Sequence, residues 1–340
     1  MTEPLVSIKG LSVRFTGERV AQALQDVSLQ LAEGETLGLL GESGSGKSVL
    51  LRSILRLNPP QRTVVGGSIR VGGQDVLSLA DAPLACYRGG VASMVFQEPG
   101  LAFDPVFTIG DQITEMIRAH ESIDRSTARA RALQMLERVQ IPQARRRMQA
   151  YAHELSGGMR QRAMIALALC CKPRLLLADE PTTALDATVQ IQILMLLREL
   201  QRELGMAVIF VTHDIGAAVE ISDRLAIMYA GRIVEQGSVV DVISSPLHPY
   251  TRGLMDSTVV SGMRGKLLSA IVGSPPDLAN LPPGCAFLPR CTRGGVRCRS
   301  EVPPQGTGEH DAACWHPLPS GIRSDSDPRI SVATYKMCRR

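Results

Sequence analysis

The sequence has few aromatic residues, little net charge and no long hydrophobic run. Aromatic side chains make up 4% of its 340 residues, and the formal net charge is +4. So small a charge imbalance gives no argument for binding nucleic acid, and we expect no such partner. No apolar segment reaches the ~18 residues needed to cross a bilayer, and the N-terminal MTEPLVSIKG lacks the basic start and apolar core of a secretory signal. We expect a cytoplasmic chain whose membrane role, if it has one, depends on a partner.

Composition divides the chain into a body and a C-terminal extension. Apolar residues make up 44% and charged residues 21%, which is ordinary for a globular protein. Of 21 prolines, 10 lie between Ser261 and Arg340, which leaves little room for helix or sheet there. We predict a folded domain over 1–260, a loop-rich extension over 261–319 and a mobile tail over 320–340.

Short apolar runs alternate with helical patterns along the body. Strands are expected at Val6–Phe15, Val27–Leu31, Thr36–Leu40, Leu175–Ala178 and Val208–Val211. Helices are expected at Val49–Leu57, Ile109–His120, Thr127–Val139, Met159–Cys171 and Ala187–Leu204. Buried strands linked by helices predict an α/β fold with a mostly parallel sheet covered on both faces. The lack of strand patterns over about 100–170 predicts a helical subdomain.

A glycine-rich segment between a buried strand and a helix is the strongest motif. GESGSGKS fits the phosphate-binding pattern G-x-x-x-x-G-K-[ST]. Glycines let successive backbone N–H groups point at phosphate oxygens, and the following helix adds the positive end of its dipole. Lys47 would bind the β- and γ-phosphates of ATP, and Ser48 would coordinate Mg²⁺. The predicted loop consists of Gly41, Glu42, Ser43, Gly44, Ser45, Gly46, Lys47 and Ser48.

Polar residues also follow the other strands of the predicted sheet. Asp179 and Glu180 end the apolar run LLLADE, Gln97 follows Met94–Phe96, and His213 ends VIFVTHD. Ligands of open α/β sheets gather at the carboxyl ends of strands. Asp179 would hold Mg²⁺ directly or through water, Glu180 would activate the attacking water, and His213 would stabilise charge at the γ-phosphate. An acidic pair or a histidine after a strand can also be merely structural.

The segment LSGGMRQR, 155–162, resembles the signature sequence of ATP-binding-cassette (ABC) ATPases. In that family two subunits face head to tail, and Ser156, Gly157 and Gly158 of each would close on the γ-phosphate bound by the other. The resemblance further implies that Phe15 stacks on adenine, that Gln97 belongs to the glutamine loop and binds Mg²⁺, and that Asp186 lies in the loop joining the subunits. His213 is similar to the switch histidine. The fold implied is an ABC-type nucleotide-binding domain with an antiparallel β flank.

A narrower resemblance concerns the ATPases of dipeptide, oligopeptide and nickel importers. YAHELSGGMRQR (151–162), FQEPGLAFDPVFTIGDQI (96–113) and SPLHPYTRGLM (245–255) are similar to segments of that group, although Gly100–Asp104 departs from it. The resemblance implies an ATP-hydrolysing importer subunit at the cytoplasmic face of the inner membrane. Its partners would be a second ABC ATPase, two transmembrane permeases and an extracytoplasmic solute-binding protein. The alternative is a soluble ABC ATPase that serves no transporter, but such proteins usually have a coiled coil or two cassettes.

Cys285, Cys291, Cys298 and Cys314 lie in the extension with 5, 6 and 15 residues between them. This spacing is not the paired C-x-x-C of common metal sites, so the residues alone leave a [4Fe–4S] cluster, zinc or free thiols open. GCAFLPRC resembles the cluster-binding extension of peptide-importer ATPases, which favours [4Fe–4S] over Zn²⁺. Arg290, Arg293, Arg297 and Arg299 could offset the negative charge of a cluster, or simply form a solvated basic loop.

Overall fold

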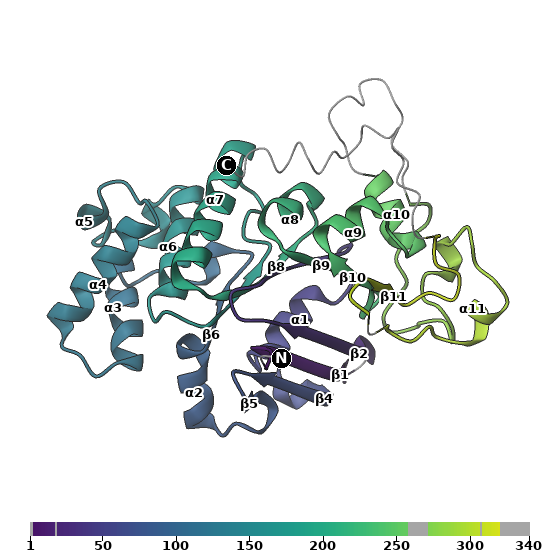
Figure 1. Ribbon diagram of the computed structural model, residues 1–340. Coiled ribbons are helices and arrows are strands. Elements are labelled where there is room, and N and C mark those ends of the chain that lie inside the picture. Colours follow the sequence, from purple (N-terminus) through teal and green to yellow (C-terminus); the bar gives the residue numbers. More distant parts are fainter. Residues whose placement is uncertain (1–2, 18, 258–270, 307, 320–340) are drawn as a thin grey trace.

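The computed structural model describes residues 3–17, 19–257, 271–306 and 308–319. The tail predicted over 320–340 lies outside these residues. Figure 1 shows the central strands with a helical region to one side and a loop-rich C-terminal region to the other.

A seven-stranded sheet forms the centre of the molecule. Its order is β11-β10-β9-β3-β8-β7-β6, in which β9, β3, β8, β7 and β6 run parallel and β10 and β11 pair antiparallel. The strands are β3 (Thr36–Leu40), β6 (Ala92–Val95), β7 (Leu175–Asp179), β8 (Ala207–Thr212), β9 (Arg224–Tyr229), β10 (Arg232–Ser238) and β11 (Asp311–Ala312). Every residue of β3, β7 and β8 is buried, as their unbroken apolar runs predict. The parallel strands bring their carboxyl ends to one edge, where the predicted site residues follow.

A second, antiparallel sheet has the order β2-β1-β4-β5 (Figure 1). Its strands are β1 (Val6–Phe15), β2 (Ala21–Leu31), β4 (Thr63–Val71) and β5 (Gln74–Asp75). Alternate residues of β1 are buried, which is the pattern of a strand with one face on a core. That face shares a hydrophobic core with the helix after the phosphate loop and with the central sheet. The antiparallel flank predicted from the family resemblance is therefore present.

Helices cover both faces of the central sheet. They are α1 (Lys47–Ile54), α2 (Asp81–Gly90), α3 (Ile109–His120), α4 (Arg125–Arg138), α5 (Ala144–Arg147), α6 (Gly157–Leu169), α7 (Ala187–Leu204), α8 (Ile215–Ile221), α9 (Val239–Ser244), α10 (Pro249–Asp256) and α11 (Arg297–Ser300). Single 3₁₀ turns are η1 (Pro60–Arg62), η2 (Val76–Ser78), η3 (Pro99–Leu101), η4 (Ala152–Glu154) and η5 (Leu288–Arg290). Val208 and Phe210 of β8 belong to the core shared with α7, whereas Ile209 and Val211 belong to the core shared with α1. In the described parts of the chain, no helix has the length and hydrophobicity needed to span a bilayer.

The region over about 100–170 contains helices α3 to α6 and, among its described residues, no strand. The side chain of Thr108 accepts a hydrogen bond from Asp111 N–H at the start of α3, and Asp124 does the same for Ser126 and Thr127 at the start of α4. Ile113 and Ile117 of α3 are fully buried in one core with α4 and α6. This packing holds the start of α6, which carries the signature residues, at a defined place beside the sheet.

The C-terminal extension is mostly loop, with only η5, α11 and β11 as regular elements in its described residues. Phe287 anchors it by packing against Tyr229 and Tyr250, at ring-centroid distances of 5.2 and 5.4 Å. Phe287 is 4% exposed, so its burial contributes roughly 2–3 kcal/mol. Strand β11 adds to the central sheet by pairing with Glu235 and Gln236 of β10. The extension thus shares a core and a sheet with the body.

Candidate nucleotide site

The phosphate loop connects β3 to α1. Gly46 precedes the helix with a φ of 104°, a left-handed conformation that favours glycine. A Cβ at Gly41 would lie 2.2 Å from the carbonyl oxygen of Met228, so a side chain is excluded there too. Ser45 N–H donates to the carbonyl of Glu42 at 3.2 Å, which closes the turn. The loop has the strand-turn-helix setting that its sequence predicted.

Lys47 begins α1 and points back into the loop. Its Nζ donates to the carbonyl oxygens of Gly41 and Glu42, at 2.7 and 2.9 Å, and to Ser45 Oγ at 3.4 Å. Burial lowers the pKa of Lys47, and the nearby charges of Glu180, Asp179 and Glu42 oppose that shift. A cation surrounded by acceptors at a helix start is suited to bind phosphate oxygens.

The predicted Mg²⁺ ligands on the loop and on β7 contact each other. Ser48 Oγ donates to Asp179 Oδ1 at 3.0 Å. Asp179 is 3% exposed, and this burial raises the pKa of its carboxyl, although the Ser48 hydrogen bond works in the other direction. A hydroxyl and a carboxylate are oxygen donors of the kind that Mg²⁺ takes beside bound phosphate. Ser48 and Asp179 therefore fit the predicted metal position.

Three side chains contact the same carboxylate oxygen of Glu180. Gln97 Nε2 donates to Glu180 Oε2 at 3.2 Å, Thr183 Oγ1 donates to it at 2.9 Å, and His213 Nδ1 lies 3.3 Å from it. Glu180 has a φ of 45°, which is uncommon for a residue with a side chain, and its N–H donates to Val211 on β8. Such held backbone outliers concentrate at functional sites. The structure thus brings Gln97, Glu180 and His213 together at the carboxyl ends of β6, β7 and β8.

The signature residues form the start of α6 in the helical region. Ser156 caps α6 by accepting a hydrogen bond from Met159 N–H at 3.3 Å, and both Ser156 and Gly157 are exposed. A Cβ on Gly157 would lie 3.8 Å from Leu185, and one on Gly158 would lie 2.9 Å from Val189. This helix end therefore neighbours the segment around Asp186, whose side chain caps α7 by accepting from Val189 N–H. An exposed helix start with two glycines is open to an anionic ligand from outside the chain.

Phe15 ends β1, where it is half-buried against the core of the antiparallel sheet. It pairs with Ala21 of β2. A Cβ on Gly46 would lie 2.8 Å from the carbonyl oxygen of Ala23, also on β2, so this sheet approaches the phosphate loop. The position is compatible with the predicted contact between Phe15 and a base.

Comparison with known proteins agrees with this geometry. The ABC transporter family model matches residues 24–183, and the oligopeptide/dipeptide transporter C-terminal region matches residues 234–298. A Brucella melitensis protein named as a peptide import ATP-binding protein is 49% identical over 89% of this chain and 93% of its own length. An Escherichia coli protein named as a D,D-dipeptide transport ATP-binding protein is 46% identical over 93% of this chain and 98% of its own length. The chain belongs to the ABC transporter ATPases.

Solved cassettes show the same fold. A dimeric ATP-binding cassette, MJ0796, bound to ADP and phosphate is 30% identical, with a TM-score of 0.62 over 69% of this chain and 98% of that one. The CbiO1 cassette of Clostridium perfringens is 25% identical, with a TM-score of 0.62 over 72% of this chain and 92% of that one. ATP binding, Mg²⁺ binding and ATP hydrolysis coupled to transport thus follow from membership of the ABC family, and the non-transport alternative is not favoured.

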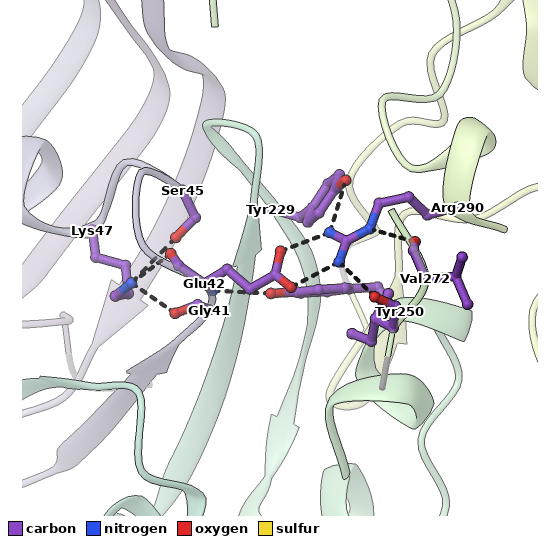
Figure 2. A network of polar contacts seen from close by, with 9 residues as sticks. Gly41, Glu42, Ser45, Lys47, Tyr229, Tyr250, Val272 and Arg290 are labelled. Atoms are coloured by element: carbon purple, nitrogen blue, oxygen red, sulfur yellow. Dashed lines mark hydrogen bonds and ion pairs between the residues drawn. The ribbon is translucent and has the colours of Figure 1, made fainter. Parts of the chain in front are cut away.

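Sequence reasoning missed the contacts that the extension makes with the phosphate loop of this ABC ATPase. Figure 2 shows Arg290 of η5 paired with Glu42, with Nη1–Oε2 and Nη2–Oε1 distances of 2.7 and 2.9 Å. Glu42 N–H donates to the hydroxyl of Tyr250 on α10 at 3.0 Å. Arg290 is therefore bound to the loop rather than free to offset charge at the cysteines. No local pattern could have revealed a pair 248 residues apart.

The structure gathers the four cysteines of the extension. Cys285, Cys291, Cys298 and Cys314 line one pocket, together with Phe287, Trp315 and His316. Burial, and to a smaller extent the other three thiols, raises the pKa of Cys314 to about 11. Within the described residues, however, no group of three or more His, Cys, Asp or Glu side chains has an arrangement that could hold a metal ion. The described residues therefore show no metal site for the predicted iron–sulfur cluster or for zinc, its alternative.

The other cysteines behave more simply. Cys170 is 2% exposed in the core of the helical region, Cys171 is half-buried, and Cys86 is exposed. Cys338 lies outside the described residues.

Proposed function

We propose that this ABC ATPase drives an importer of dipeptides or oligopeptides and that Glu180 is its general base. The convergence of Gln97, Thr183 and His213 on Glu180 Oε2, beside Lys47 and Asp179, carries the proposal. All three contacts fall on Oε2, which leaves Oε1 to accept a proton from a water molecule. A carboxylate held in this way keeps its orientation while it polarises the attacking water.

Lys47 and the loop N–H groups would bind the β- and γ-phosphates, and Ser48 and Asp179, with Gln97, would hold Mg²⁺. The bound ion would neutralise charge on the phosphates. His213 lies 3.3 Å from Glu180 and is 65% exposed in its side chain, so its ring can turn toward a γ-phosphate without displacing core residues. Phe15 would stack on the adenine.

A second ATPase subunit would complete each site. At the start of α6, Ser156 and Gly157 are exposed and Gly158 is half-buried, beside the segment that contains Asp186. The dimeric state of the similar cassette MJ0796 supports a head-to-tail dimer in which this helix end meets the partner's nucleotide. Closure of the dimer on ATP and its reopening after hydrolysis would be the working cycle.

The importer would comprise two permease subunits in the inner membrane, this peripheral chain at their cytoplasmic face and an extracytoplasmic solute-binding protein. The oligopeptide/dipeptide C-terminal region and the dipeptide-transport relative support a peptide cargo, with a nickel chelate as the second candidate. Uptake of a labelled dipeptide, a labelled oligopeptide and Ni²⁺ by cells with and without this chain tests the cargo. Loss of Ni²⁺ uptake alone would contradict the peptide assignment.

Glu180→Gln tests the proposed chemistry. The variant should bind ATP but lose about 10²–10⁴-fold in turnover, because general-base catalysis contributes on this scale. It should also run as a dimer in gel filtration with Mg·ATP, since the closed state cannot hydrolyse its nucleotide. Glu199→Gln, on an exposed position of α7, is the matched control. Turnover within twofold of wild type in Glu180→Gln would remove Glu180 from the mechanism.

We further propose a [4Fe–4S] cluster, with Zn²⁺ as the alternative, on Cys285, Cys291, Cys298 and Cys314. The shared pocket supports this, since four thiols on a proline-rich loop suit a group that staples the loop. Anaerobically purified protein should contain about four iron and four sulfide per chain. Cys298→Ser should lose them and Cys86→Ser should not. Zinc without iron would refute the cluster, and absence of both would refute a metal site.

A further inference from the structure

Arg290 is placed so that its charge acts on the phosphate loop. It lies in the extension, immediately before Cys291, yet its side chain is only 4% exposed. All five of its N–H groups have acceptors. Nε donates to Val272 O at 3.2 Å, Nη1 donates to Glu42 and to Tyr229 Oη at 3.4 Å, and Nη2 donates to Glu42 and to Ile271 O at 3.4 Å (Figure 2). A fully bonded guanidinium is a fixed part of the structure rather than a mobile surface charge.

Glu42 is held at three points. Arg290 binds both carboxylate oxygens, Tyr250 accepts from its N–H, and its carbonyl accepts from Lys47 Nζ. Tyr250 is itself packed on Tyr229 and Phe287, at centroid distances of 4.6 and 5.4 Å. The second residue of the phosphate loop is thus fixed by the extension and by α10.

The charge of Glu42 poses a problem for a loop that binds polyphosphate. A carboxylate next to the binding residues repels the ligand, and the backbone carbonyl of Glu42 already lies 2.9 Å from Lys47 Nζ. A bidentate guanidinium cancels that charge and turns the carboxylate away from the loop. Without Arg290, an uncompensated negative charge would remain beside the nucleotide.

We propose that Arg290 is a positioning residue for nucleotide binding, through which the C-terminal extension neutralises and fixes Glu42 and thereby sets the affinity of the phosphate loop for ATP. This rests on the proposed role of Gly41–Ser48 as the nucleotide site. Two unit charges about 10 Å apart in a setting of intermediate polarity change an equilibrium constant by about tenfold. We therefore expect the affinity for ATP to fall about tenfold when the positive charge of Arg290 is removed.

The test measures ATP and ADP dissociation constants for wild type, Arg290→Met and the double variant Glu42→Gln with Arg290→Met. Methionine keeps an unbranched apolar stem over the rings of Tyr229 and Phe287, which lie 5.8 and 6.0 Å from the guanidinium carbon. Arg290→Met should weaken ATP binding about tenfold and ADP binding less, because ADP carries less charge. The loss should shrink as salt is raised. The double variant should recover most of the affinity, because the repelling charge is gone.

Arg297→Met is the matched control, since Arg297 lies in the same extension but stacks on Trp315 and pairs with Glu301. It should bind ATP as wild type does. A cooperative urea transition in the fluorescence of Trp315, the one tryptophan in the sequence, verifies that the extension stays folded in each variant. The emission intensity itself is not compared, because Arg297→Met removes the group that stacks on this ring. Wild-type affinity in Arg290→Met would overturn the proposal, as would a loss that the double variant does not recover, which would make Arg290 merely structural. Failure of wild type to bind ATP would instead refute the nucleotide site itself.

Discussion

Glu235→Gln should loosen the attachment of the C-terminal extension to the body. The side chain of Glu235 is fully buried on β10, and its two oxygens accept three hydrogen bonds. Leu247 N–H and His310 Nε2 lie 2.8 and 2.9 Å from Oε1, and His248 N–H lies 2.8 Å from Oε2. One buried carboxylate thus connects β10, the start of α10 and the extension.

The magnitude follows from these three bonds. The glutamine amide can keep its oxygen toward Leu247 and His310, but its NH₂ then faces the His248 N–H, which loses its acceptor. An unsatisfied buried donor costs about 1–3 kcal/mol, and the two bonds that remain lose their charge assistance at roughly 0.5–1 kcal/mol each. The sum is about 3 kcal/mol. With a urea dependence of about 2 kcal/mol/M, the midpoint should fall by about 1–2 M.

Trp315 gives a direct assay. Its indole N–H donates to Glu301 O at 3.1 Å within the extension, and no second tryptophan contributes to the signal. Urea titration followed by Trp315 fluorescence should show the shift, with Glu309→Gln, an exposed carboxylate of the same loop, as control. A Trp315 midpoint in Glu235→Gln equal to that of the control would show that the buried carboxylate does not hold the extension, and the reasoning would fail.

Two further predictions concern pH and the phosphate loop. The hydrogen bond with Glu235 raises the pKa of His310, so the protonated histidine stabilises the fold below the unfolded pKa of about 6.5, and that contribution is lost as pH rises through the higher folded value. The Trp315 urea midpoint of wild type should therefore exceed that of His310→Gln at pH 6, and the difference between the two midpoints should be smaller at pH 9. A difference that does not change with pH would exclude a charged His310. Lys47→Ala removes the buried Nζ that contacts Gly41 and Glu42. Equilibrium titration should show ATP binding weakened by at least tenfold, because a charge-assisted bond to phosphate contributes about 1.5–3 kcal/mol. Unchanged affinity for ATP would refute the assignment of this loop to phosphate binding.

Elements with strong local patterns could be predicted from the sequence. Thr36–Leu40 and Ala187–Leu204 have the predicted bounds, because one is an unbroken apolar run and the other has a long helical period. Strand β4, Thr63–Val71, was missed because Gly66 and Gly67 interrupt it; its pairing with β1 supplies what its propensity lacks. Helix α6 begins at Gly157 rather than Met159, since the cap at Ser156 outweighs two glycines.

The candidate site likewise contains residues whose proximity could be inferred from the sequence and contacts that could not. The loop, Asp179, Glu180 and His213 follow strands whose carboxyl ends must meet, so their proximity could be inferred from sequence order. The bond from Tyr250 to Glu42 and the partner of Arg290 depend on how a loop-rich extension folds back over the body. That path is set by long-range packing around Phe287, which no periodicity encodes.

The two-residue strand β11 has a consequence beyond its size. It occupies the outer side of β10 through the pairing at Glu235 and Gln236, and Ala313 N–H donates to Val234 O at 2.8 Å. A chain cut after α10 would leave backbone groups of β10, whose residues are mostly buried, unpaired on this side. An unpaired edge strand can pair with the same strand of another molecule, so truncated forms of the protein should precipitate or form oligomers. By covering this edge of the central sheet, the C-terminal region should therefore also protect the protein from aggregation.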